Sequence, residues 1–226
     1  MQTNGGFLVK QAVRPILYHG VREGHAMTVV FIIGGMGAGK STAREALTDM
    51  GLAAIDFDQI GHEALTLPEV QADLAQAFGS DVVGADGIVN RSLVAQRAFA
   101  SSEATAALNA ITLPRIGRLF AQRIAQLEAA GHRTIVVESS NFPGRDSGLV
   151  REGDVVIAVT APEKLRIART VAAGWDEEDV RRRIAQQATD AERAAMADAV
   201  FDNSGSAAEL RRAVQEWWRS LRSKQS

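Results

Sequence analysis

The chain has 226 residues, 46% of them hydrophobic, and its 25 lysines and arginines nearly balance 27 aspartates and glutamates. A chain of this length can bury a core that needs no cross-links, and the absence of cysteine excludes disulfides, thiolate metal sites and cysteine nucleophiles. With a formal net charge of -2, no bulk field draws the protein to nucleic acid, and no run approaches the roughly 18 apolar residues of a membrane span. We therefore expect a cytoplasmic monomer or small homo-oligomer, with neither nucleic acid nor membrane as a partner.

Residues 1–26 differ from the rest of the chain because they lack a sustained apolar pattern. They contain no apolar run long enough for the core of a signal peptide, and Met27 then opens the segment MTVVFIIGG. We expect residues 1–26 to form a poorly ordered extension, and residues 27–226 to form the working domain. The alternative is that residues 7–9 and 16–18 form a short strand or arm that packs on this domain.

From Met27 onward, apolar runs typical of buried strands alternate with apolar residues at helical spacing. In chain order, the expected elements are strand 29–33, helix 41–50, strand 52–55, helix 59–78, turn-rich connection 79–89, helix 92–100, helix 103–130, strand 134–137, strand 154–159, helix 162–173, helical pair 175–197, strand 199–201 and helix 207–221. Breaks are expected at Pro68 and Pro114 inside the two longest helical patterns. This alternation predicts an α/β fold, with a parallel sheet covered by helices on both faces.

The segment GGMGAGKS, residues 34–41, matches the phosphate-loop pattern G-x-x-x-x-G-K-[ST] and lies between an expected buried strand and an expected helix. Its glycines let successive backbone N–H groups face phosphate oxygens, and the helix adds its positive N-terminal end. Lys40 supplies a mobile cation for the β- and γ-phosphates, and the Ser41 hydroxyl is placed to ligate Mg²⁺. The residues predicted to bind a nucleoside triphosphate are Gly35, Gly37, Ala38, Gly39, Lys40, Ser41 and Thr42.

Two carboxylates, Asp56 and Asp58, follow the expected strand 52–55. In an open α/β sheet the carboxyl ends of the strands face the ligand crevice, and alternate strand residues point the same way. One carboxylate could therefore accept a proton from an attacking hydroxyl while the other, Asp56, holds Mg²⁺. The alternative is that an aspartate merely caps the helix that starts near Gln59. An acidic residue at this distance also suits a dinucleotide-binding fold, but the Lys40-Ser41 pair favours a nucleoside triphosphate.

Five segments follow in order and spacing the pattern of the dephospho-CoA kinase family, which the chain resembles from Met27 to about Trp218: GGMGAGKST, AIDFDQIGHEAL, FGSDVVGADGIVNRSLV, LNAITLPRI and RRIAQQATDAERAAMADAVFDNSGSAAEL. The resemblance implies transfer of the γ-phosphate of ATP, with Mg²⁺, to the ribose 3′-hydroxyl of dephospho-CoA. It also implies that Asp58 is the general base and that Arg91 lies in the acceptor-binding region. Asn203 and Gly205 would lie in the loop beside the adenine of ATP.

The same resemblance predicts the architecture. It implies a P-loop NTPase three-layer fold with a parallel sheet, to which a helical acceptor-binding insertion and a lid are added. The helical acceptor-binding region would cover residues of about 60–130, and the lid residues of about 170–182.

Three departures from the family pattern bear on the mechanism. Leu113 stands where the family usually has a histidine before proline, and residues 138–146 read ESSNFPGRD in place of an acid, Pro-Leu-Leu and an acid. Ala172 occupies the place of an arginine that the family carries in its lid. Arg166 and Arg169 lie one or two helical turns earlier, and by counting alone they replace it only if the register shifts.

These departures keep two alternatives open beside dephospho-CoA phosphorylation. One is a P-loop kinase for another small hydroxylated acceptor, suggested by the changes at Leu113 and at residues 139–145. The other is a non-catalytic relative that binds ATP without efficient transfer, suggested by Ala172, because a lid arginine can contribute on the order of 10³–10⁵ in rate.

Overall fold

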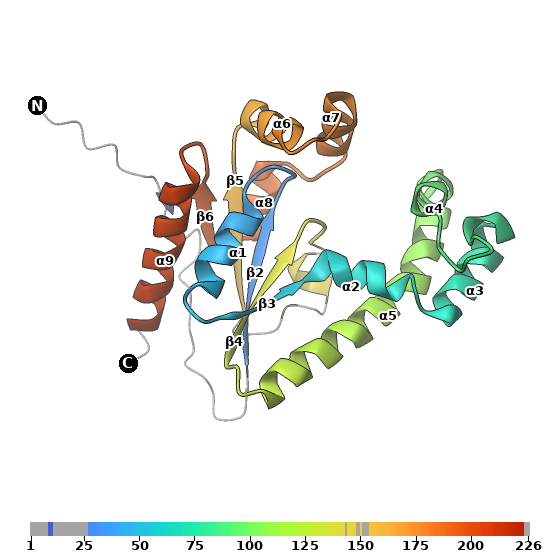
Figure 1. Ribbon diagram of the computed structural model, residues 1–226, viewed down its shortest axis with the longest axis horizontal. Coiled ribbons are helices and arrows are strands. Elements are labelled where there is room, and N and C mark those ends of the chain that lie inside the picture. Colours follow the sequence, from blue (N-terminus) through green and yellow to red (C-terminus); the bar gives the residue numbers. More distant parts are fainter. Residues whose placement is uncertain (1–8, 11–26, 143, 148–149, 151–153, 224–226) are drawn as a thin grey trace, which may run out of the picture. The chain divides into compact units, whose positions relative to one another are not determined.

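The computed structural model describes residues 9–10, 27–142, 144–147, 150 and 154–223 (Figure 1). The chain divides into two compact units. The first unit combines Met1–Asp56 with Leu127–Ser226, and the second consists of Phe57–Gln126. None of the helices in the described residues combines the length and the apolar character that a membrane crossing requires.

The first unit is built on a six-stranded sheet with the strand order β1-β6-β5-β2-β4-β3. The strands are β1 (Val9–Lys10), β2 (Thr28–Gly34), β3 (Ala53–Asp56), β4 (Thr134–Ser139), β5 (Val155–Thr160) and β6 (Ala199–Asp202). Within the described residues, strands β2 to β6 run parallel to one another, and β1 pairs antiparallel with β6. β2 is a central strand, so the loop that follows it opens at the middle of the carboxyl edge.

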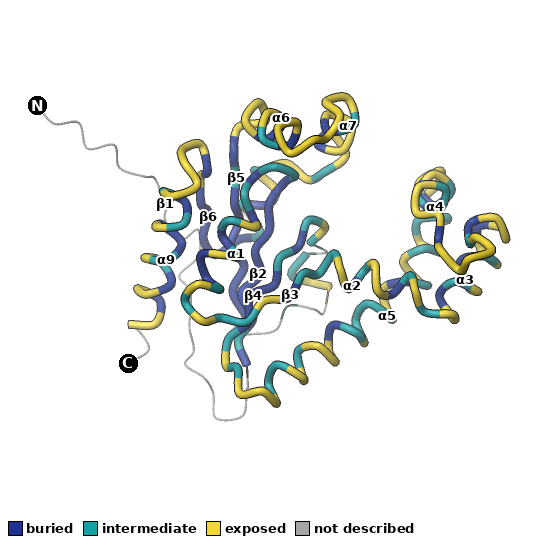
Figure 2. Tube along the Cα trace, viewed as in Figure 1, coloured by how far each residue is buried: buried dark blue, intermediate teal, exposed yellow. Residues whose placement is uncertain are grey.

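β2 is buried along almost its whole length, which agrees with its unbroken apolar sequence. Because strand side chains alternate between faces, Val30 and Ile32 join a core against two helices, α1 (Lys40–Thr48) and α9 (Ala207–Ser223). The amphipathic α9 contributes Leu210 and Trp218 to this core. Figure 2 shows the buried face of α9 turned toward the strands.

Three further helices follow β5 and complete the first unit: α6 (Glu163–Ala172), α7 (Glu177–Ala185) and α8 (Asp190–Met196). A short 3-10 turn, η2 (Arg145–Ser147), precedes β5. α6 and α7 pack through Ile167, Val180 and Ile184, and Met36 of the segment after β2 lies against the same cluster. Helices α6 and α7 therefore share a small apolar core that reaches the phosphate loop.

The second unit is helical and consists of α2 (Phe57–Ala64), α3 (Pro68–Phe78), η1 (Ser80–Val82), α4 (Arg91–Ala98) and most of α5 (Ser102–Ala129). Its core contains Leu74, Phe78, Val82 and Val94. The Asp81 carboxylate forms two 2.6 Å bonds with Arg97, and this pairing holds the pKa of Asp81 below its ordinary value. This pairing links η1 to the last turn of α4.

Two expectations from the sequence need comment. The helix expected over residues 103–130 is not interrupted, because α5 continues through Pro114. Proline removes one helical hydrogen bond and crowds the preceding turn, yet a helix of 28 residues retains the bonds on either side. Of residues 1–26, the structure describes Val9 and Lys10, which pair with β6; the expected arm at residues 16–18 and the rest of the expected extension lie outside the described residues.

Replacing Leu210 by alanine tests the assigned core. Leu210 is 0% exposed, so Leu210→Ala should lower the free energy of unfolding by about 2–5 kcal/mol. The matched variant Leu165→Ala, at a position that is 36% exposed, should lower it by less than about 1 kcal/mol. All three tryptophans lie in the first unit, so urea unfolding followed by their fluorescence measures both changes. Equal losses from the two variants would contradict the assignment.

Candidate functional site

The phosphate loop follows β2 directly and ends at the first residue of α1. Inside it, the Ala38 N–H donates to the Gly35 carbonyl at 3.1 Å, which closes a tight turn. Lys40 is only 7% exposed, and its Nζ lies 3.5 Å from the same carbonyl. Gly39 precedes α1 without a capping side chain, so the N-terminal N–H groups of this helix are left for an anionic ligand.

The loop requires glycine because other segments approach its backbone closely. A Cβ at Gly37 would come within 3.0 Å of the Arg166 backbone, and the φ of Gly37 is +73°. A Cβ at Gly39, where φ is +103°, would come within 3.0 Å of the Asn203 amide nitrogen. Residues with side chains rarely adopt a positive φ. At both positions, therefore, the backbone conformation and the lack of space each exclude residues other than glycine. The loop therefore has no side chains at these positions, so its backbone can surround an anion.

Asn203 holds the phosphate loop from the end of β6. The side chain is 4% exposed, and its Nδ2 donates to the Ala38 carbonyl at 2.8 Å. Arg169 of α6 in turn donates to the carbonyls of Asn203 at 2.9 Å and of Gly205 at 3.1 Å. Asn203 Oδ1 is buried without a hydrogen-bond partner. The structure thus brings Asn203 and the predicted phosphate loop together, and it adds Arg169 as the support of the Asn203–Gly205 loop.

Two carboxylates lie side by side at the carboxyl edge of the sheet. Asp56 ends β3 and is in register with Glu138 of β4. Glu138 forms a 3.3 Å ion pair with Arg44 of α1. Ser41, in the first turn of α1, is exposed. The edge therefore offers carboxylate oxygens on the strands and a hydroxyl on the helix, which are the ligand types that Mg²⁺ prefers.

The other two predicted residues, Asp58 and Arg91, belong to the second unit. α2 begins at Phe57, so Asp58 lies inside its first turn, and the expectation of a helix starting near Gln59 with an aspartate before it is wrong by two residues. Arg91 is exposed at the first position of α4. Its neighbour Asn90 caps this helix by accepting a 3.1 Å bond from the Leu93 N–H.

Two arginines that motif spacing did not select lie against the phosphate loop. Arg166 of α6 is 7% exposed and Arg193 of α8 is 3% exposed. A Cβ at Gly35 would come within 3.0 Å of Arg166 Nη1 and to 3.3 Å from Arg193 Nη1. Ala172, where the family pattern has an arginine, is exposed in the last turn of α6. The two arginines are identified by their burial, which sequence spacing does not reveal.

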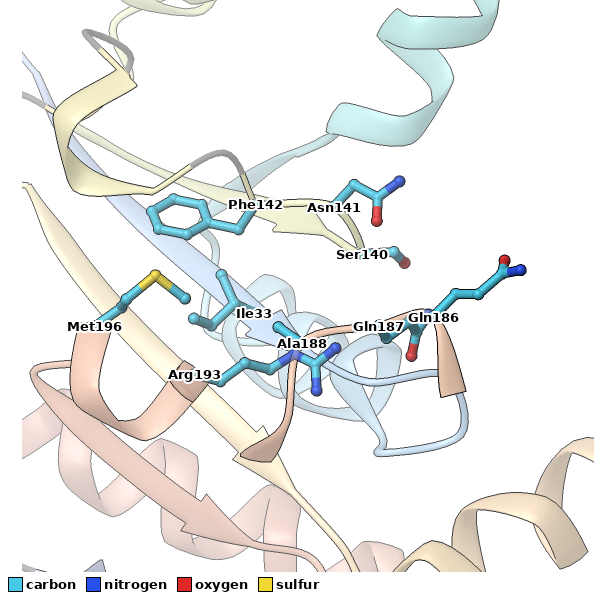
Figure 3. A pocket seen from close by; sticks show the side chains of 9 residues that line it. All are labelled: Ile33, Ser140, Asn141, Phe142, Gln186, Gln187, Ala188, Arg193 and Met196. Atoms are coloured by element: carbon cyan, nitrogen blue, oxygen red, sulfur yellow. The ribbon is translucent and has the colours of Figure 1, made fainter. Parts of the chain in front are cut away.

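A pocket of about 90 Å³ is lined in part by Arg193 (Figure 3). It is lined by the end of β2, the segment after β4 and the connection from α7 to α8: Ile33, Ser140, Asn141, Phe142, Gln186, Gln187, Ala188, Arg193 and Met196. Gln187 also accepts a 2.9 Å hydrogen bond from the Met36 N–H of the phosphate loop. The segment after β4, which departs from the family pattern, thus shares a pocket with Arg193.

The hydrogen-bond donors and the metal-ligand side chains of the first unit fit a nucleotide and Mg²⁺. The glycine positions form a cradle that a Cβ would fill, and Lys40 stands at one end of it. The described residues contain no group of three or more histidine, cysteine, aspartate or glutamate side chains suited to a metal ion. Mg²⁺ needs no such cage, because it is held by one or two protein ligands together with phosphates and water. Ser41 and Asp56 are sufficient for that role.

Comparison with known proteins identifies relatives along most of the chain. Residues 28–209 match the family model described as dephospho-CoA kinase. The dephospho-CoA kinase of Corynebacterium efficiens is 42% identical over 187 residues, which cover 82% of this chain and 92% of that protein. The dephospho-CoA kinase of Streptomyces avermitilis is 36% identical and covers 86% of this chain and 94% of its own length.

Solved structures show the same fold. TT1252 from Thermus thermophilus superposes with a TM-score of 0.72 at 27% identity, covering 86% of this chain and 98% of its own. Dephospho-CoA kinase from Campylobacter jejuni superposes with a TM-score of 0.57 at 21% identity, covering 87% and 98%. The sheet and its flanking helices therefore have the α/β arrangement of P-loop kinases, as the sequence predicted.

Replacing Gly37 by alanine tests the cradle. The φ of +73° and the nearby Arg166 backbone both oppose a Cβ, so Gly37→Ala should weaken ATP binding at least about tenfold, because positive φ and a steric clash each cost of order 1–3 kcal/mol. The matched variant Gly117→Ala adds a Cβ to α5, where nothing lies within 4 Å, and should leave ATP affinity unchanged. Titration calorimetry with ATP gives both values; unchanged affinity in Gly37→Ala would refute the assigned role of the loop.

Proposed function

The chain belongs to the dephospho-CoA kinase family, and from this premise we propose that it transfers the γ-phosphate of ATP to the ribose 3′-hydroxyl of dephospho-CoA, which yields coenzyme A. One observation carries the proposal: a complete phosphate loop, folded with its lysine and its helix, lies in a chain that matches this family over residues 28–209. We further propose that the kinase works in the cytoplasm, where ATP is supplied.

ATP binding rests on the phosphate loop. The backbone N–H groups of Gly37 and Gly39, followed by those of Ser41 and Thr42, are the proposed contacts to the phosphates, with the positive end of α1 behind them. Ala38 lines the same loop, with its N–H donated to the Gly35 carbonyl. Lys40, held with its Nζ near the Gly35 carbonyl, offsets the negative charge that grows on the phosphoryl oxygens during transfer. The loop that contains Asn203 and Gly205 is the proposed neighbour of the adenine.

Mg²⁺ is the proposed cofactor of the nucleotide. Ser41 and Asp56 would hold it, Asp56 through water. The chemistry that the ion would supply when bound is neutralisation of negative charge on the phosphates. Glu138, in register with Asp56 on the neighbouring strand, is paired with Arg44. Asp56 is the strand-end carboxylate that we assign to the ion.

Asp58 is the proposed general base. It follows the edge strand β3 by one residue and lies in the first turn of α2. In the reaction, the 3′-oxygen of dephospho-CoA forms a bond to the γ-phosphorus, the bond to the leaving ADP oxygen breaks, and the hydroxyl proton passes to the Asp58 carboxylate. Arg91, exposed at the start of α4, is the proposed partner of an anionic group of the acceptor, because arginine binds phosphate through paired N–H donors.

The acceptor is tested by incubating the protein with Mg-ATP and dephospho-CoA and following the product by mass spectrometry. We expect a product that is heavier by one phosphoryl group and carries it on the 3′-oxygen. Lys40→Ala should lower kcat by at least about 100-fold, since a positioned charge in the transition state contributes this much. Transfer to a panel of sugars and nucleosides, without transfer to dephospho-CoA, would instead support a kinase for another hydroxylated acceptor, which the exposed Leu113 favours.

Replacing Asp58 by asparagine tests the base. The amide cannot accept the hydroxyl proton, so Asp58→Asn should lower kcat by about 10²–10⁴-fold while ATP affinity changes less than threefold. The matched variant is Asp73→Asn, because Asp73 is a carboxylate of the same unit that forms a partly buried ion pair with Arg115 at 3.1 Å. It should keep the parent kcat. Steady-state kinetics measure both, and parent kcat in Asp58→Asn would remove the residue from the mechanism.

A further inference from the structure

Arg166 and Arg193 are brought to one place from two helices. Both are buried, and both point a guanidinium nitrogen at the space above Gly35 of the phosphate loop. Figure 3 shows Arg193 reaching from α8 toward the segment that carries Gln187 and Ala188. Two buried cations at the same residue repel each other, so their juxtaposition costs free energy unless an anion offsets it.

A single carboxylate serves both arginines. Asp190 Oδ1 lies 3.3 Å from Arg193 Nη1 and 3.8 Å from Arg166 Nη1. Arg166 Nε and Nη1 are buried without a hydrogen-bond partner. Burial lowers the pKa of the Arg193 guanidinium, Asp190 and Glu192 raise it, and the charge of Arg166 lowers it. Two buried guanidinium groups thus share one carboxylate within 4 Å and keep unsatisfied N–H donors, a combination that an additional anion would correct.

The place of the cluster indicates which anion it takes. Lys40 Nζ approaches the carbonyl of Gly35, the residue against which both guanidinium groups lie. The lysine of a phosphate loop reaches the β- and γ-phosphates. The two arginines thus stand at the terminal-phosphate end of the loop and away from Asn203, which lies at Gly39.

We propose that Arg166 and Arg193 together bind the γ-phosphate of ATP and the charge that develops on it during transfer. This inference rests on the proposed function. It explains how the chain works with alanine at position 172, where the family carries a lid arginine. The positive charge comes instead from Arg166 in the middle of α6 and from Arg193 in α8, and no change in helix register is needed. Asp190 holds the guanidinium groups in place before the nucleotide arrives.

The test compares ATP with ADP, which lacks the γ-phosphate. We expect Arg166→Ala and Arg193→Ala to weaken ATP binding by about 10- to 100-fold, the contribution of a charge-assisted hydrogen bond, and to change ADP binding less than threefold. The matched variant Arg181→Ala removes an exposed lid arginine that is paired with Glu177 at 2.7 Å, and it should change neither. Titration calorimetry on the full chain gives all affinities without reference to an acceptor.

Kinetics add a second readout. In the same two variants, kcat for dephospho-CoA should fall by about 10³-fold or more, with the KM for dephospho-CoA within threefold of the parent. Arg166→Lys keeps the charge but loses the paired donors, so it should recover part of the ATP affinity. It also keeps a buried cation beside Asp190 if the alanine variant does not fold.

The outcomes separate this inference from the proposed function. Equal losses of ATP and ADP affinity would show that the arginines only hold the loop, and parent ATP affinity with parent kcat would remove them from the site; either result overturns the inference while the phosphorylation of dephospho-CoA stands. A selective loss of ATP affinity in a chain that does not phosphorylate dephospho-CoA would support the inference and refute the proposed acceptor.

Discussion

The site depends on one steric constraint: backbone and side chains from three distant segments approach the phosphate loop so closely that Gly34, Gly37 and Gly39 have no room for a Cβ. A Cβ at Gly34 would come within 3.0 Å of the Val159 carbonyl of β5, one at Gly37 within 3.0 Å of the α6 backbone, and one at Gly39 within 3.0 Å of Asn203. Strand β5, helix α6 and the end of β6 therefore fix the path of the loop. Packing thus restricts the conformation of the loop before an anion binds.

Positive charge is likewise concentrated locally, around the phosphate loop. The whole chain has a formal charge of -2, yet the loop is surrounded by Lys40, Arg166 and Arg193, all buried. Buried charges act through a lower dielectric than exposed ones and are less screened by salt. Attraction for a triphosphate is thus generated within the first unit, while the surface remains close to neutral.

The two units contribute different residues to the proposed reaction. The first unit contains the phosphate loop, and its helices α6 and α7 pack on Met36 of the loop through their own apolar cluster. The second unit contains Asp58 in α2 and Arg91 in α4, and α4 is held by the Asn90 cap and by the pairing of Asp81 with Arg97. Chain connectivity links them most directly between Asp56 and Asp58, where β3 passes into α2. The proposed Mg²⁺ ligand and the proposed base are thus separated by one residue at the boundary.

The sequence by itself determined the α/β class, the phosphate loop and the family, because each depends on residues that are contiguous or regularly spaced: an apolar strand, a glycine loop and an amphipathic helix. It did not reveal that α5 continues through Pro114, since the cost of one proline is outweighed by the bonds of the surrounding turns. Only the tertiary structure decided which arginines face the loop. Arg166 and Arg193 lie on separate helices far along the chain from Gly35, and spacing within a motif cannot show that two helices bury their cations at one backbone position.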